Sequence, residues 1–318
     1  MDHGFNYLNT NEQMKKNNIY LSIVLSTYNE EKYIAKSIQS ILDQSYPYFE
    51  FIIVNDGSTD NTLHIIKSFV DSRIVIIDKP NTGLPDSLNE GIKAAKYDWI
   101  ARMDGDDIAA PNRFETQVQY IDDSVGVIGG QFKTIDENDK LSITSISSKP
   151  LKYSTCKWWL LLGMSPLAHP TVLIRKSCLL EHGGYDANFR AAQDMELWSR
   201  LSPDVKIINI PESVLFYRKH SNNISNKRKQ LQMQLTFLGY LKYVLQIRRP
   251  LSSDEFIKFK NYFANNGLIQ QNESLFYWSH NGRGLLRKIN IIIYYLWRLQ
   301  LIIRYRICIS TTTNRIFS

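Results

Sequence analysis

Cysteine is scarce in this chain of 318 residues, which has only Cys156, Cys178 and Cys308. Their positions have neither the paired spacing of a zinc site nor that of a redox motif, and a disulfide-stapled domain is excluded. We therefore expect three buried thiols in a reducing compartment. No Gly-x-Gly-x-x-Gly follows the first apolar run, and no phosphate-binding P-loop is present. These absences argue against a dinucleotide-dependent dehydrogenase and against an ATPase.

The chain also lacks a run of about 20 uncharged apolar residues, the length that a membrane-spanning helix requires. Its apolar C-terminal stretch, residues 289–309, is interrupted by Arg298, Arg304 and Arg306. Each arginine at the bilayer centre would cost at least about 2.5 kcal/mol, so this stretch is not expected to span a membrane. The N-terminus has no apolar signal core either, and residues 1–18 are expected to form a disordered leader.

The net charge of +7 is unevenly distributed. Residues 226–318 carry 15 Lys/Arg and 3 Asp/Glu, a balance of +12, so the remainder carries −5. A basic segment is expected to meet an anionic surface. Tyrosine and tryptophan lie among the arginines of the tail, which is typical of a helix at the surface of an anionic membrane. Packing of the tail against the rest of the chain is the alternative, and no motif supports a nucleic-acid partner.

Apolar runs alternate with amphipathic segments through the first hundred residues. The runs, which we expect to be strands, are Ile19–Ser26, Phe49–Asn55, Arg73–Asp78 and Trp99–Met103. Continuous apolar runs indicate strands buried on both faces, and apolar residues three and four apart in the intervening segments indicate helices. This pattern predicts an α/β fold with a Rossmann-like, mostly parallel central sheet flanked by helices. Ligands of such sheets bind beyond the carboxyl ends of the strands.

The pattern becomes less regular from Val125 onward. Further strands are expected at 125–132, 171–175, 205–210 and 214–217, with a hairpin turn at 136–139 and an amphipathic helix from Gln193. Residues 158–162 form a short apolar stretch of unassigned structure. We expect one large domain over residues 19–245 and a basic, aromatic, helical extension over residues 246–318.

Three carboxylates lie within four residues in the turn Asp104-Gly105-Asp106-Asp107, directly after the fourth expected strand. Carboxylates this close repel one another unless a cation joins them. Hard ions such as Mg²⁺ and Mn²⁺ prefer carboxylate oxygens, and Mg²⁺ usually binds through one or two carboxylates plus substrate phosphates. The alternative is an acidic loop that caps a helix beginning near Pro111. Asp56 ends the second strand and should face the same crevice.

Five motifs occur in the order and approximate spacing of the family 2 inverting glycosyltransferases, which have the GT-A fold. The motifs are Thr27-Tyr28-Asn29-Glu30, Val54–Asp60, Asp104–Asp107, Gln193-Asp194 and Tyr217-Arg218-Lys219-His220. The chain resembles this family over about residues 19–225 and is most similar to bacterial enzymes that build surface polysaccharides. It departs from the usual pattern at Gln193, where a glutamate often stands.

The resemblance implies a hexosyltransferase that uses a divalent metal ion, Mn²⁺ or Mg²⁺, and a UDP-sugar donor. By the same resemblance, Asp106 and His220 bind the metal, and Asp194 is the base that accepts the proton of the acceptor hydroxyl. The donor-binding residues that it implies are Thr27, Tyr28, Glu30, Asp56, Asn81, Asp104 and Arg218.

Structural roles remain open for several of these residues. Asp56 fits a turn, Thr27 and Glu30 fit helix capping, and Arg218 fits an ion pair. His220 fits a polar surface loop. Asp194 fits the first turn of a helix, where the dipole favours a carboxylate.

On the acceptor side, the resemblance points to Trp158, Trp159 and His169. For the two tryptophans a position in the core is slightly favoured, and His169 stays open between an acceptor contact and a structural hydrogen bond. The expected acceptor is a saccharide or a lipid-linked saccharide. The expected location is the cytoplasm, with peripheral attachment to the inner face of a bacterial membrane. Transfer to a polyprenyl phosphate and a catalytically silent nucleotide-sugar-binding scaffold are the alternatives.

Overall fold

The computed structural model describes residues 18–221 and 229–281, together with residues 297, 300–301, 312–313 and 316. The expected leader, apart from residue 18, lies outside the described residues. So do Cys308 and most of the basic stretch at 289–309. The domain boundary between residues 245 and 246 stays a prediction.

Strands and helices alternate through the first hundred residues as predicted. The strands are β1 (Leu21–Thr27), β2 (Phe49–Asp56), β3 (Ile74–Lys79) and β4 (Trp99–Asp104). The helices that connect them or follow them are α2 (Ile34–Leu42), α3 (Thr62–Ser68), α4 (Leu84–Ala94) and α5 (Arg113–Val118).

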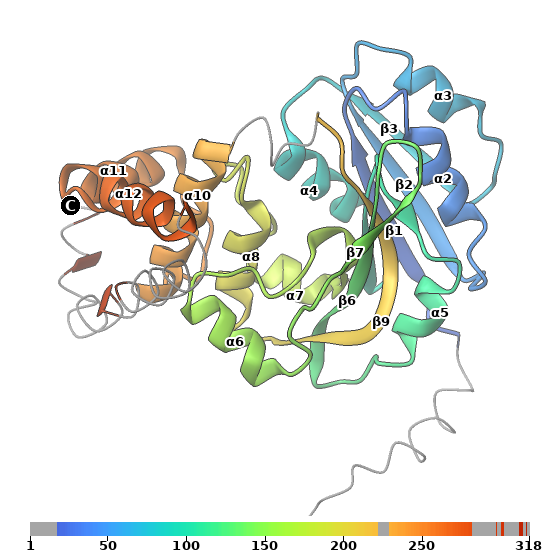
Figure 1. The fold of residues 1–318 in the computed structure, drawn as a ribbon. Coiled ribbons are helices and arrows are strands. Elements are labelled where there is room, and N and C mark those ends of the chain that lie inside the picture. Colours follow the sequence, from blue (N-terminus) through green and yellow to red (C-terminus); the bar gives the residue numbers. More distant parts are fainter. Residues whose placement is uncertain are drawn as a thin grey trace, which may run out of the picture.

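The second half adds strands that run in both directions. They are β5 (Ile108–Ala109), β6 (Val125–Ile135), β7 (Leu141–Ile146), β8 (Leu173–Arg175) and β9 (Lys206–Arg218). Within the described residues, nine strands form one sheet in the order β3-β2-β1-β4-β8-β6-β9-β5, with β7 beside β6 (Figure 1). The first four strands are parallel, whereas β8 is antiparallel to both of its neighbours. The sheet is therefore parallel at one end and mixed at the other.

Both faces of β1, β2 and β4 are almost wholly buried, which explains why their sequences are mostly apolar, whereas the edge strand β3 is half-exposed. Val24 of β1 belongs to one hydrophobic cluster, and its neighbours Ile23 and Leu25 belong to a second. Helix α4 contributes Leu88 to the first cluster, and α2 contributes Ile38 to the second. Alternate residues thus point to helices on opposite sides of the sheet.

Two expectations for the second half were wrong. Residues 205–217 do not form two strands, because β9 runs without a break past Pro211. The pairing of β9 with β6 shifts register around Gly129 and Gln131, and such an irregularity accommodates a proline that cannot donate a ladder hydrogen bond. The strand expected at 171–175 is shorter, because His169–Thr171 form a 3₁₀ turn before β8 begins. The hairpin turn at 136–139 is confirmed by the antiparallel pairing of β6 with β7.

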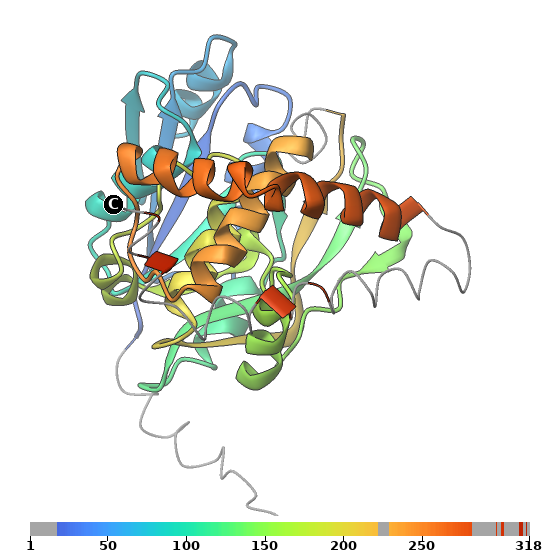
Figure 2. The ribbon, with the colours of Figure 1, turned by 90° about the vertical axis from the view of Figure 1, so that its left-hand side faces the viewer.

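Most of the remaining helices cover one side of the molecule, on the left in Figure 1. The remaining helices are α6 (Tyr153–Leu161), α7 (Lys176–Glu181), α8 (Gln193–Leu201), α10 (Lys229–Val244), α11 (Ser253–Asn265) and α12 (Leu268–Asn281). Figure 2 shows α11 and α12, in orange, crossing this side of the molecule in front of α10. Phe259 and Phe263 of α11 belong to the same hydrophobic cluster as Trp198 of α8. No helix in the described part of the chain is long and apolar enough to cross a bilayer.

Candidate active site

The acidic turn lies at the carboxyl edge of the parallel strands, as predicted. Ser26 of β1 pairs with Val54 of β2 on one side and with Asp104 of β4 on the other. Asp56 and Asp104 are the last residues of β2 and β4, and these two strands flank the end of β1 at Thr27. This edge brings the first three motifs together.

Three side chains from distant parts of the sequence could hold a metal ion. The ligand atoms of Glu30, Asp106 and His220 all lie within 4.8 Å of one another. Nε2 of His220 is 2.9 Å from Oδ2 of Asp106. Asp104, Asp106 and Asp107 form a second group within the same limit. Carboxylate oxygens at this spacing are ligands that suit Mn²⁺ and Mg²⁺, so Glu30 and the aspartates fit the ion that the sequence predicts, and His220 adds a nitrogen ligand.

The acidic turn is electrostatically unfavourable without a cation. Burial, together with the charges of Asp106 and Asp194, raises the pKa of Asp104 to about 6, although Arg102 acts in the opposite direction. Burial and the charges of Asp106 and Asp104 also raise the pKa of Asp107. Oδ2 of Asp107 is buried without a hydrogen-bond partner among the described residues. A cation in this turn would relieve that repulsion.

Glycine is required at the centre of the acidic turn because the turn packs directly against β1. A Cβ atom at Gly105 would lie 2.8 Å from Oγ1 of Thr27 and 3.3 Å from Cδ1 of Ile34. Both neighbours are buried. The close approach of these residues holds the carboxylates of the turn at the edge of the sheet.

We expect Gly105→Ala to lower the free energy of unfolding by about 1–3 kcal/mol, because the added methyl group overpacks this contact. Displacement of the turn should also weaken Mn²⁺ binding. Thermal unfolding and calorimetric titration with Mn²⁺ measure the two effects. Gly239→Ala is the control, since a Cβ there would make only ordinary contacts, the nearest at 3.4 Å. Unchanged stability and metal affinity in the Gly105 variant would show that the turn tolerates displacement.

Asp56 is held in a dense set of hydrogen bonds. Its Oδ1 accepts from Nζ of Lys79 at 2.6 Å and from the amide of Thr82 at 2.9 Å, and its Oδ2 accepts from the amide of Gly83 at 2.9 Å. Burial alone would raise the pKa of Asp56, but the ammonium of Lys79 and the two amides outweigh it and lower the pKa. The carboxylate is therefore fixed in its charged form.

Near Asp56 lie Asn81, which the sequence predicts to bind the nucleotide-sugar, and the exposed ring of Tyr28. Nδ2 of Asn81 donates to the backbone carbonyl of Asp56 at 2.9 Å, so Asn81 supports this turn. Tyr28 is 46% exposed and its ring is open to stack on a base. Oγ1 of Thr27 is buried and has no hydrogen-bond partner among the described residues.

Arg218 is committed to structural contacts. It is 1% exposed, and its guanidinium forms an ion pair with Asp139. Its Nε donates to the carbonyl of Asp106 at 2.7 Å, while its own amide donates to Oδ1 of Asp107 at 2.8 Å. These contacts favour the ion-pair interpretation of Arg218 over a contact with the donor diphosphate. Arg218 holds the acidic turn in place.

Asp194 lies in the first turn of α8 and interacts electrostatically with the acidic turn. Its charge contributes to the raised pKa of Asp104, so the two carboxylates lie close enough to interact. Oγ of Ser165 lies 3.4 Å from Oδ2 of Asp194. Glu196 is directed elsewhere, as predicted, because it is fully buried against Arg200 and Lys242.

Lys149 is a neighbour of Asp194 that the sequence did not indicate. Burial lowers the pKa of Lys149, and the charge of Asp194 acts in the opposite direction. The ammonium donates to the carbonyl of Ser165 at 3.0 Å and lies 5.6 Å from the ring centre of Trp159. Its sequence position, between β7 and α6, gave no signal for this placement.

The three predicted acceptor residues differ in their surroundings. Trp158 is 59% exposed, so the favoured core position is wrong for it, whereas Trp159 is half-buried. His169 is buried, and its Nε2 lies 2.7 Å from the hydroxyl of Tyr185. Burial and the charge of Arg102 lower the pKa of His169 well below its usual value. His169 thus makes a structural hydrogen bond.

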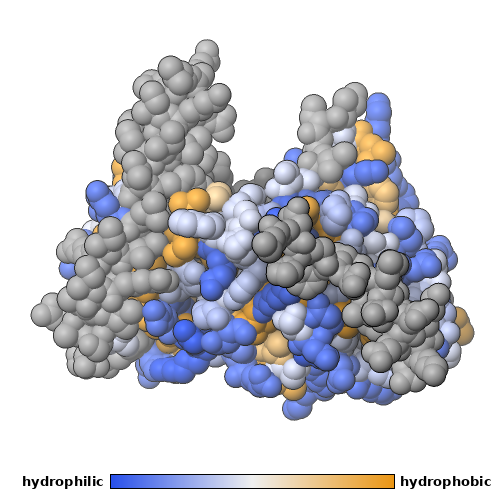
Figure 3. All heavy atoms as spheres, turned by 90° about the horizontal axis from the view of Figure 1, so that it is seen from below, coloured by the Kyte–Doolittle hydropathy of each residue, from blue (hydrophilic) through white to orange (hydrophobic). Residues whose placement is uncertain are grey.

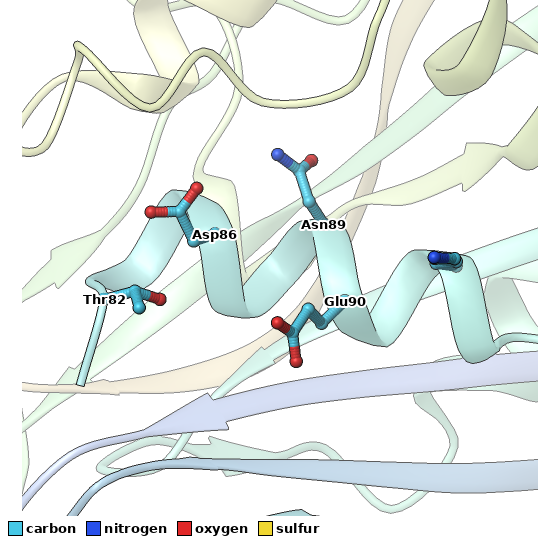
Figure 4. Close-up of a pocket in the computed structure, with 5 residues that line it drawn as sticks. Thr82, Asp86, Asn89 and Glu90 are labelled. Atoms are coloured by element: carbon cyan, nitrogen blue, oxygen red, sulfur yellow. The ribbon is translucent and has the colours of Figure 1, made fainter. Parts of the chain in front are cut away.

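A cavity of about 310 Å³ lies along α4 (Figure 4). It is lined by Thr82, Asp86, Asn89, Glu90 and Lys93. None of these residues was predicted to belong to the site. Thr82 donates its amide to Asp56, so the cavity adjoins the Asp56 turn. We place the candidate active site next to this cavity, at the carboxyl edge of the sheet, where Glu30, Asp106 and His220 meet and where Asp194 interacts with Asp104.

Family models place this architecture among the glycosyltransferases. The model described as "Glycosyl transferase family 2" matches residues 22–182, and "Glycosyltransferase like family 2" matches residues 139–265. The chain therefore belongs to glycosyl transferase family 2, and it is a glycosyltransferase by membership of that family.

Individual relatives and solved structures agree with the family. The O-antigen biosynthesis glycosyltransferase WbnJ of Escherichia coli is 31% identical over 64% of this chain and 81% of its own length. The putative glycosyltransferase EpsE of Bacillus subtilis is 31% identical over 73% of this chain and 84% of its own.

The solved structures show the same fold. S. aureus TarS in complex with UDP-GlcNAc has a TM-score of 0.60 and 16% identity, covering 93% of this chain and 90% of that chain. A mannosyltransferase from Pyrobaculum calidifontis, in complex with GDP-Man and Mn²⁺, has a TM-score of 0.54 and 14% identity, covering 96% and 94%. The predicted GT-A fold class is confirmed.

Proposed function

We propose that this glycosyltransferase moves a sugar from a UDP-sugar to a saccharide or lipid-linked saccharide in surface polysaccharide biosynthesis, with inversion and with a divalent metal ion. The observation that carries the proposal is the convergence of Glu30, Asp106 and His220 beside Asp104, on which the charge of Asp194 acts. The relatives support the rest, because one acts in O-antigen biosynthesis and a structure of the same fold binds UDP-GlcNAc.

The donor lies along the edge of β1 and β2 in this proposal. Tyr28 stacks on the uracil ring, and Asp56 accepts a hydrogen bond from it through the remaining acceptor capacity of Oδ2. The fixed charge and orientation of Asp56 come from Lys79 and the amides of Thr82 and Gly83. Asn81 supports the turn, and Thr27, whose buried hydroxyl packs against Gly105, contributes by holding the acidic turn beside the nucleoside site.

The diphosphate lies at the acidic turn. Asp106 and His220 would hold the metal ion there, together with Glu30, which lies within reach of both although the sequence assigned it to the nucleoside. A bound divalent cation supplies charge stabilisation for the departing diphosphate, worth several kcal/mol. Arg102 pairs with Asp104, and Arg218 fixes the backbone of the turn from the buried side.

The acceptor approaches from the side of α8. Asp194 accepts the proton of its hydroxyl, which general base catalysis requires on the face opposite the leaving group. Ser165 and Lys149 orient the carboxylate from one side. The half-buried ring of Trp159 lies beside Lys149 and is available to pack against a sugar ring.

A panel of UDP-sugars with Mn²⁺ tests this function. The cognate donor should raise the melting temperature, since a ligand bound only by the native state stabilises it. Its transfer or hydrolysis should disappear with EDTA and return with Mn²⁺. Asp106→Asn should lose both responses, whereas Asp98→Asn, an exposed carboxylate at the opposite end of β4, should keep them. Turnover that persists in EDTA would refute the metal dependence, and binding without any turnover would favour the scaffold.

A further inference from the structure

Helix α6 has apolar residues on two opposite faces, of which only one is covered. Cys156 and Leu160 are buried in the hydrophobic cluster that includes α8 and α10. Trp158 lies two residues from each of them, which places it about 200° around the helix. It is 59% exposed, and Leu151, just before the helix, is 44% exposed. A helix that is apolar on both faces normally has a partner for each.

The charge around α6 shows what kind of partner fits. Residues 140–180 contain no aspartate or glutamate, although lysines occur at 140, 149, 152, 157 and 176 and an arginine at 175. Lys157 lies over the ring of Tyr153 with its ammonium 5.1 Å from the ring centre. Asp204 acts electrostatically on Tyr153 at the start of the helix, and Asp194 acts on the buried Lys149. On the exposed side, a tryptophan and a leucine flanked by Lys152 and Lys157 complement the surface of an anionic lipid bilayer.

The position of α6 relative to the candidate active site gives this surface a role. Trp159, the next residue, lies beside Lys149, whose ammonium interacts with Asp194. Figure 1 places α6 at the lower edge of the molecule. Figure 3 views that underside, where hydrophobic patches interrupt a hydrophilic surface. A membrane bound at α6 would thus lie on the acceptor side of Asp194.

We propose that α6 is a membrane-docking helix that inserts Trp158 and Leu151 into the interfacial region of an anionic membrane, with Lys152 and Lys157 at the headgroups. Membrane docking itself does not depend on the proposed function. Only the role given to docking, which is to bring a lipid-linked acceptor to Asp194, rests on it. It assigns membrane contact to the catalytic part of the chain, in addition to the basic tail predicted from sequence.

Sedimentation of the full-length protein with vesicles tests this. Wild type should bind vesicles of phosphatidylglycerol and phosphatidylcholine at low salt and should bind pure phosphatidylcholine more weakly. Leu151→Ser/Trp158→Ser should lower the partition coefficient at least about tenfold, because two apolar side chains lose their burial. Lys152→Gln/Lys157→Gln should lower it about tenfold for anionic vesicles only. Leu180→Ser/Ile257→Ser, two residues that are 57% and 54% exposed on other helices, is the control.

The outcomes separate docking from catalysis. Absence of vesicle binding by wild type, or a wild-type partition coefficient in the Leu151/Trp158 variant, overturns the proposal. A dimer that forms without vesicles and dissociates in that variant also overturns it, in favour of a second copy on α6. The variant should keep the melting-temperature rise with Mn²⁺ and UDP. Loss of vesicle binding with that rise intact leaves the proposed function standing, whereas vesicle binding without any donor response refutes the function alone.

Discussion

Asp194→Asn is expected to lower turnover by about 10²–10⁴-fold, the contribution typical of a general base. The asparagine keeps the size of the side chain and can still interact with Ser165, but it cannot accept the proton of the acceptor hydroxyl. Donor binding should be unaffected, because the contacts that we assign to the donor come from β1, β2 and the acidic turn. Steady-state kinetics together with calorimetric titration of UDP and Mn²⁺ measure the two quantities.

A matched control for this variant lies near the other end of the same segment. Asp204 follows α8 and forms an exposed ion pair with Arg248, with Oδ1 of Asp204 2.9 Å from Nη1. Asp204→Asn removes a carboxylate without approaching the acidic turn, so turnover should stay near that of wild type. Near-normal turnover in a folded Asp194→Asn protein would refute the base assignment. A parallel loss of UDP affinity would instead show that Asp194 contributes to donor binding.

The parallel half of the sheet could be predicted because its sequence signal is local and redundant. Each of the first four strands is a mostly apolar run of five to eight residues in the sequence, and each helix between them has its own apolar stripe. The rule that ligands bind beyond the carboxyl ends of parallel strands then placed Asp56 and Asp104 in one crevice. The break expected within β9 was wrong because Pro211 lies at an irregularity in the pairing with β6, which the sequence of one strand cannot show.

The site was predictable in outline, whereas its contacts depend on chain folding over long separations. Motifs identified Asp106 and His220, which are 114 residues apart and 2.9 Å from each other. The placement of Glu30 beside them depends on how the β1–α2 loop crosses the crevice, so it was assigned to the nucleoside instead. Lys149 belongs to no motif, and its approach to Asp194 follows from the packing of the segment before α6. Such residues emerge only from the assembled structure.

Four buried charges connect α8 to α10. Glu196 accepts from Nε and Nη2 of Arg200 at 2.7 and 2.8 Å, and it also pairs with Nζ of Lys242. The same ammonium lies 3.2 Å from Oδ2 of Asp186. All four side chains are at most 1% exposed. Two positive and two negative groups balance one another here, and their burial keeps solvent from replacing a missing partner.

Lys242→Met is therefore expected to lower the free energy of unfolding by about 3–5 kcal/mol, the cost of leaving an uncompensated charge buried. The methionine fills nearly the same volume as the lysine, so the substitution should leave no sizeable cavity and the change in packing should contribute little. Denaturant unfolding measures the change. Arg248→Met is the control, because it breaks the exposed pair with Asp204 and should cost at most about 1 kcal/mol.

A second substitution distinguishes the charge from the packing. In the Lys242→Met background, Asp186→Asn makes the buried cluster neutral again. The asparagine still has one oxygen to accept from the amide of Leu251, which donates to Asp186 at 3.0 Å in the wild type. The double variant should therefore be less destabilised than the sum of the two single changes, since neighbours in one network do not add. Strict additivity would mean that the loss arises from packing. Because Asp194 lies in the first turn of α8, we also expect Lys242→Met to reduce turnover more than it reduces UDP affinity at temperatures where the protein stays folded.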